Sequence, residues 1–102
     1  MSNIIGLNNN HPLVGKWQAT DGFSDVIVSI EPKNNSFIVN VVDESDGEVA
    51  EVYETNFDGD ALRFNVHWLG NGRFIKYRFL LTDKNTIDVT YTYSSQETWQ
   101  KI

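Results

Sequence analysis

Apolar and polar residues alternate along most of this chain, in short runs separated by Gly, Asn, Asp and Pro. Alternation with a period of two is typical of a β-strand that buries one face. Eight such runs are predicted, at residues 16–20, 25–30, 36–42, 49–57, 61–69, 74–81, 86–93 and 97–102. No window outside residues 1–12 has a helical period, so the pattern predicts an all-β chain.

Short turns join these runs. Asp58-Gly59 and Asn71-Gly72 are strong hairpin signals, because Gly adopts the positive φ that tight hairpins need. Short connections favour an antiparallel meander, and closure of a meander removes its exposed edges. We therefore predict a single eight-stranded antiparallel up-and-down barrel over residues 13–102, preceded by an N-terminal arm at 1–12. A two-sheet sandwich is the alternative.

The alternation also predicts the inner face of each run. The inner set is Val26, Val28 and Ile30; Phe37, Val39 and Val41; Leu62, Phe64, Val66 and Trp68; Ile75, Tyr77, Phe79 and Leu81; and Ile87, Val89, Tyr91 and Tyr93. The run at 49–57 is less regular. Val49, Tyr53 and Phe57 fit an inner face there, but the same parity also brings Glu51 and Thr55 inward.

The predicted interior is rich in aromatic rings. An eight-stranded barrel has room for its own side chains or for one small ligand, and buried Tyr hydroxyls need hydrogen-bond partners. The candidate ligand-binding residues are Tyr53, Phe64, Trp68, Tyr77, Phe79, Tyr91 and Tyr93. The alternative is that these rings only fill the core.

Two short motifs stand at the ends of the predicted barrel. Gly15-Lys16-Trp17 begins the first run, and Trp99-Gln100-Lys101 lies in the last. Together with the eight runs, they resemble the lipocalin-like (calycin) superfamily. The resemblance implies a closed barrel end built from Gly15, Trp17, Trp99 and Lys101, with Lys101 covering Trp17. The chain lacks the outer helix and the disulfide typical of that family, and Trp17 as an ordinary core residue is the alternative.

The charge of the chain restricts its partners. The net charge is −6 and the pI is about 4.6, which disfavours nucleic acid and anionic membranes. Four of the predicted turns lie at the open mouth of the predicted barrel, where Arg73 is the main positive charge. Their acidic residues are Asp21, Asp25, Asp43, Glu44, Asp46, Glu48 and Glu97. An acidic rim suits a neutral or cationic aromatic ligand better than a fatty acid.

No catalytic or metal-binding pattern is visible. The chain has no Cys, which excludes disulfides and thiolate metal sites, and His11 and His67 alone make no zinc site. We predict a small non-enzymatic protein without cofactor that binds a small neutral or aromatic apolar ligand inside the barrel. A protein-interaction or protease-inhibitor-like module that uses the arm or the rim is the alternative. Monomer and homodimer stay open, and the absence of a recognisable signal peptide predicts a cytoplasmic protein.

Overall fold

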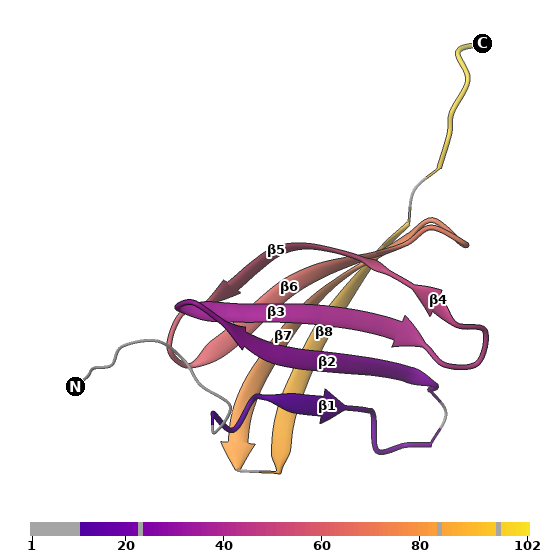
Figure 1. Cartoon of the computed structure of the whole chain (residues 1–102). Helices are drawn as coiled ribbons and strands as arrows, with labels where there is room; N and C mark the ends of the chain where they lie inside the picture. Colours follow the sequence, from indigo (N-terminus) through magenta and orange to yellow (C-terminus); the bar gives the residue numbers. More distant parts are fainter. Residues whose placement is uncertain (1–10, 23, 84, 96) are drawn as a thin grey trace.

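The strands of this protein form two antiparallel sheets (Figure 1). The computed structural model describes residues 11–22, 24–83, 85–95 and 97–102. The strands are β1 (Gly15–Trp17), β2 (Val26–Lys33), β3 (Ser36–Asp43), β4 (Glu48–Val49), β5 (Glu51–Phe57), β6 (Ala61–Trp68), β7 (Arg73–Asp83) and β8 (Thr86–Ser95). The sheet orders are β1-β2-β3-β4 and β5-β6-β7-β8, so within each sheet the strands that follow one another in sequence are paired.

The prediction of a single closed barrel is wrong, whereas the all-β class is confirmed. Among the residues that the structure describes, β1 is hydrogen-bonded to β2 alone and β8 to β7 alone. Two local features account for the open edges. Strand β1 has three residues, and the predicted eighth run, 97–102, forms no strand. Closure requires paired edges of similar length, and this chain does not supply them.

The chain crosses between the sheets in one extended stretch. Strand β4 pairs with β3, the Ala50 N–H donates to the Val41 carbonyl at 2.9 Å, and β5 then pairs with β6. The predicted run at 49–57 therefore serves both sheets. In Figure 1 the strands β1–β3 run across β7 and β8 at a steep angle, as in sandwiches whose strands switch sheets at a bend.

The core lies between the two inner faces. Its most buried side chains are Ile30 and Val41 from the first sheet, Leu62, Phe64 and Val66 from the second, and Leu13 from the segment before β1. The parity predicted for residues 28–30, 37–41 and 62–68 agrees with this burial. Apolar side chains on alternate positions supply the hydrophobic stabilisation of such a core.

The predicted arm at 1–12 lies outside the described residues, apart from His11 and Pro12. The His11 ring is edge-on to Phe37 and Phe57, with ring centroids 5.1 and 5.5 Å away. Its Nδ1 accepts a hydrogen bond from the Leu13 N–H at 3.1 Å. Burial lowers the pKa of His11 and so favours its neutral form at this end of the core.

Candidate ligand-binding site

A β-bulge in β5 decides which side chains reach the outer face of the second sheet. Tyr53 is opposite Asn65, but Asn56 is opposite Arg63, so β5 has one residue more than β6 in this interval. Glu54 lies in the bulge with φ of 54°, in the left-handed region that side chains rarely adopt. An extra residue inverts the parity of a strand.

The prediction that Tyr53 shares the inner face with Phe57 is therefore wrong. Before the bulge, Val52 packs on the core, while Glu51 and Tyr53 face outward opposite His67 and Asn65. After the bulge, Phe57 pairs with the buried Leu62 and packs inward. The sequence contained one sign of this bulge. Regular alternation over 49–57 would place Glu51 in the core, and burial of a carboxylate without a partner is costly.

One carboxylate fixes two aromatic rings on this outer face. Glu51 accepts hydrogen bonds from the Tyr53 hydroxyl and, at 3.0 Å, from His67 Nδ1. The His67 ring in turn stacks on Phe74, with centroids 4.1 Å apart and planes 2° from parallel. The bond from Tyr53, followed by that from His67, lowers the pKa of Glu51. The same bond raises the pKa of Tyr53, so the pair stays carboxylate and neutral phenol at neutral pH.

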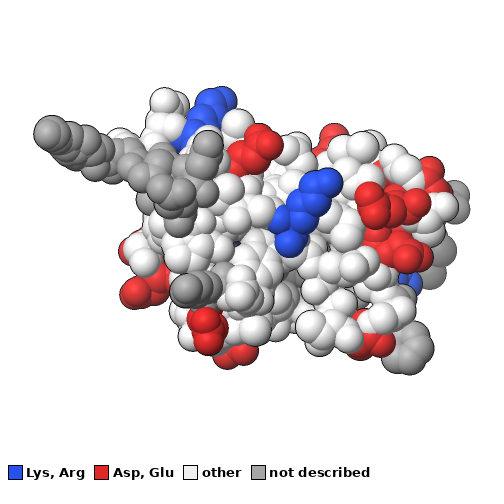
Figure 2. All heavy atoms as spheres, turned by 60° about the horizontal axis from the view of Figure 1, so that its bottom comes forward, with Lys and Arg blue, Asp and Glu red and all other residues white. Residues whose placement is uncertain are grey.

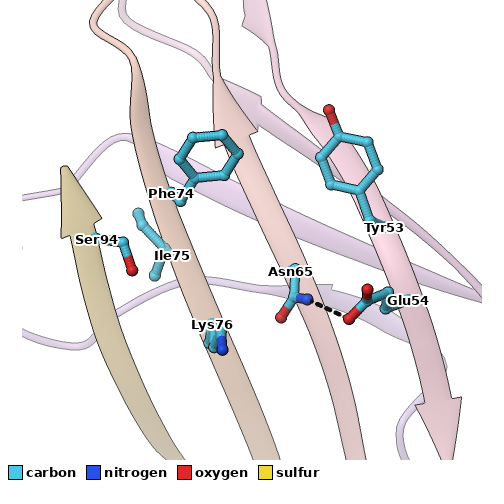
Figure 3. A pocket seen from close by; sticks show the side chains of 7 residues that line it. All are labelled: Tyr53, Glu54, Asn65, Phe74, Ile75, Lys76 and Ser94. Atoms are coloured by element: carbon cyan, nitrogen blue, oxygen red, sulfur yellow. Dashed lines mark hydrogen bonds between the residues drawn. The ribbon is translucent and has the colours of Figure 1, made fainter. Parts of the chain in front are cut away.

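A shallow hollow of about 560 Å³ lies on this outer face, lined by the rings of Tyr53 and Phe74. Its lining residues are Tyr53, Glu54, Asn65, Phe74, Ile75, Lys76 and Ser94. Figure 3 shows the rings of Tyr53 and Phe74 on the strands either side of the one that carries Asn65. Asn65 Nδ2 donates to Glu54 Oε2 at 2.8 Å. Lys76 is exposed and makes no ion pair with any residue in the described part of the chain.

The candidate ligand-binding residues predicted from the sequence are not gathered in one place. Phe64, Trp68 and Phe79 are buried in the core. Tyr77 is partly buried and stacks on Phe64, with centroids 5.2 Å apart. Tyr91 and Tyr93 lie exposed on β8, and the Arg73 guanidinium is 5.9 Å from the Tyr93 ring centre.

Only Tyr53 from that set lines the outer hollow. Sequence reasoning missed Glu54, Asn65, Phe74, Lys76 and Ser94, because it looked for a site on inner positions alone. Of these residues, Asn65, Phe74 and Lys76 fall on the outward parity of their runs.

The residues predicted to form a closed barrel end are also separated. Gly15 and Trp17 lie in β1, where Trp17 Nε1 donates to the Leu13 carbonyl at 2.9 Å. Trp99 is 87% exposed, and it and Lys101 lie in a segment outside both sheets. The predicted closed end depended on the barrel, which the structure does not form.

Five acidic residues lie together at one end of the first sheet: Asp25, Asp43, Glu44, Asp46 and Glu48. The turn after β3 meets the start of β2 where the Glu44 N–H donates to the Asp25 carbonyl at 2.9 Å. Figure 2 shows the densest group of acidic side chains at the right-hand end of the face that it presents, with others along its left and lower margins. Among residues 11–22, 24–83, 85–95 and 97–102, no group of three or more His, Asp or Glu side chains is arranged to hold a metal ion.

Comparison of the chain with protein-family models, curated proteins and solved structures finds no match. The resemblance to lipocalins therefore stays a prediction from the sequence. Within the described ranges there is no helix with the length and apolar character needed to cross a bilayer.

The strain at Glu54 can be measured with two substitutions. Glu54→Gly and Glu54→Ala both remove the carboxylate, but only Gly adopts a φ of 54° without strain. We expect the Gly variant to have a free energy of unfolding about 1 kcal/mol higher than the Ala variant in urea denaturation. Glu31→Gly and Glu31→Ala, at an exposed position of β2, are the matched control pair. There the Ala variant should have the higher free energy of unfolding. Higher stability of Ala at position 54 would contradict the bulge.

Tyr77 provides a test at alkaline pH. Burial raises the pKa of Tyr77 to about 12, and the nearby Tyr93 and Tyr91 add to the shift. Because an unfolded phenol ionises near pH 10, the stability that Tyr77 contributes is complete below pH 10 and is lost as the pH rises to about 12. An ultraviolet titration should show a phenol step near pH 12 that Tyr77→Phe removes and Tyr91→Phe retains. Persistence of that step in Tyr77→Phe would refute the assignment.

Proposed function

We propose that the protein is a binding module whose outer hollow takes a small neutral polyhydroxylated ligand, such as a mono- or disaccharide. The observation that carries this proposal is the bulge at Glu54. It holds a strained backbone conformation and aims the Glu54 carboxylate onto Asn65, beside Tyr53, whose ring Glu51 fixes. Strained residues and bulges persist where the surrounding structure imposes them, and they cluster at functional sites.

The lining of the hollow has the two kinds of group that a sugar needs. The rings of Tyr53 and Phe74 offer apolar faces for the C–H side of a pyranose. Glu54 and the Asn65 carbonyl oxygen accept hydrogen bonds from hydroxyls, while Lys76 and Ser94 donate. The rings are held before binding, so a ligand loses little free energy in ordering them.

Charge and polarity argue against other small ligands. Glu54 and Lys76 give the hollow one negative and one positive group, and the chain as a whole carries −6, which repels anions. A wholly apolar ligand would desolvate Glu54 and Lys76 without offering hydrogen bonds in return. A neutral ligand rich in hydroxyls satisfies both groups.

The proposal keeps only the neutral charge of the ligand predicted from the sequence: the ligand is rich in hydroxyls instead of apolar, and its site lies outside the core. Phe64, Trp68 and Phe79 fill the interior, and the hollow lies on the opposite face of the same sheet. Its volume of about 560 Å³ is in the range of small-molecule sites.

The test is a ¹H–¹⁵N NMR titration of the full chain with glucose and cellobiose, and with glucose 6-phosphate as the matched anion. We expect the neutral sugars to shift the amide signals of Tyr53, Asn65 and Lys76, and the phosphate ester to bind more weakly. Asn65→Ala should weaken binding roughly tenfold. Asn40→Ala, an exposed change on the outer face of β3, should leave the affinity unchanged.

Two results would overturn the proposal. One is the absence of shifts at these three amides at millimolar concentrations of either neutral sugar. The other is equal binding by the Asn65→Ala variant, because the affinity would then come from elsewhere on the surface.

A further inference from the structure

Strand β8 leaves one edge of the second sheet open. It runs over ten residues, Thr86–Ser95, and within the described part of the chain it pairs with β7 on one side and with no strand on the other. The other outermost strands, β1, β4 and β5, have three, two and seven residues. A long open edge has a row of backbone N–H and C=O groups that can pair with another strand.

This edge lacks the features that usually prevent pairing. Natural edge strands are protected by Lys, Pro, bulges or short length. Strand β8, TIDVTYTYSS, has no Lys and no Pro, and Asp88 is its one charged residue. The register shift between β7 and β8 falls near their connecting turn, at Leu81 and Asp83. Most of the strand is therefore regular and almost uncharged.

The inner face of β8 is rich in apolar and aromatic side chains, and beyond Ile87, which packs partly on the core, it is exposed. Val89, Tyr91 and Tyr93 are 43%, 55% and 56% exposed. Phe79 and Ile75, their neighbours on β7, are 2% and 5% exposed. The apolar face therefore continues from the core to the open edge, where part of it remains in contact with water.

We propose that the occupant of this edge is β8 of a second copy of the chain, paired antiparallel about a two-fold axis at Thr90. The strand is self-complementary in this register. Each Tyr91 faces the partner's Val89, and each Tyr93 faces the partner's Ile87. Aromatic and β-branched residues form favourable cross-strand pairs.

The polar side of the strand agrees with the same register. Thr90 faces its own copy, and Asp88 faces the partner's Thr92, so no like charges are opposed. A register shifted to Tyr91 would instead place Ile87 opposite the partner's Ser95. A symmetric pair satisfies both open edges at once and joins two four-stranded sheets into one of eight strands.

This inference is independent of sugar binding, although the two surfaces meet. Ser94 of β8 lines the outer hollow, and in the dimer it would face the partner's Thr86. The dimer would thus extend the sheet beside the hollow without covering Tyr53 or Asn65 on the far strands.

Crosslinking tests the register directly, because the chain has no Cys of its own. Residues opposed in an antiparallel pair have Cα atoms about 4.5–5.5 Å apart, within the range of about 4.4–6.8 Å that disulfides span. Under mild oxidation, Thr90→Cys should form a covalent dimer rapidly. Asn40→Cys, exposed on β3 away from the edge, should not.

Sedimentation of the full chain over a range of concentrations is the second measurement. We expect a monomer–dimer equilibrium that Thr90→Lys weakens by more than about tenfold, because two ammonium groups would face each other across the axis. Asn40→Lys is the matched control and should dimerise like the natural chain. Circular dichroism checks that both variants fold.

Three outcomes would overturn the inference. The first is a monomer at every concentration, which leaves the edge to a different polypeptide. The second is a dimer that Thr90→Lys does not weaken, which places the contact elsewhere. The third is faster crosslinking through Tyr91→Cys than through Thr90→Cys, which excludes this register.

Discussion

The packing of the two inner faces against each other is the constraint on which the other features depend. Phe64 stacks on Tyr77 and meets Phe79 edge-on, with ring centroids 5.2 and 5.1 Å away. Val41 and Ile30 close the core from the opposite sheet. The predicted pocket rings of Phe64, Trp68 and Phe79 are buried in this core. Both proposed recognition surfaces therefore lie elsewhere, on the outer face and at the open edge of the second sheet.

The bulge at Glu54 converts one outer face from a plain strand surface into a shaped one. Without the extra residue, Tyr53 would remain on the side of Phe57, and Glu51 would point into the core. With it, Glu51 joins Tyr53 and His67 outside, and Glu54 reaches Asn65. One irregular residue thus keeps a carboxylate out of the core and fixes the side chains around the hollow.

Most of the local structure was predictable from the sequence, whereas the closure of the fold and the site were not. The alternation at 62–68 and the Gly-containing turns specify strands and hairpins through neighbouring residues alone. Barrel closure depends on whether β1 and β8 pair, which is a contact between the two ends of the described chain. The bulge is a register shift between β5 and β6. Alternation describes each strand separately, so it does not reveal how two strands pair. Only the inward parity of Glu51 signalled the irregularity.

The direction of Tyr53 is the central claim, and its nuclear Overhauser effects test it most directly. The structure predicts contacts from the Tyr53 ring protons to the side chain of Glu51, which accepts a hydrogen bond from the Tyr53 hydroxyl on the outer face. It predicts none to Phe64 or Val66, which lie on the inner face. Strong effects from the Tyr53 ring to Phe64 or Val66 would place the tyrosine in the core. The bulge, and the hollow that depends on it, would then be wrong.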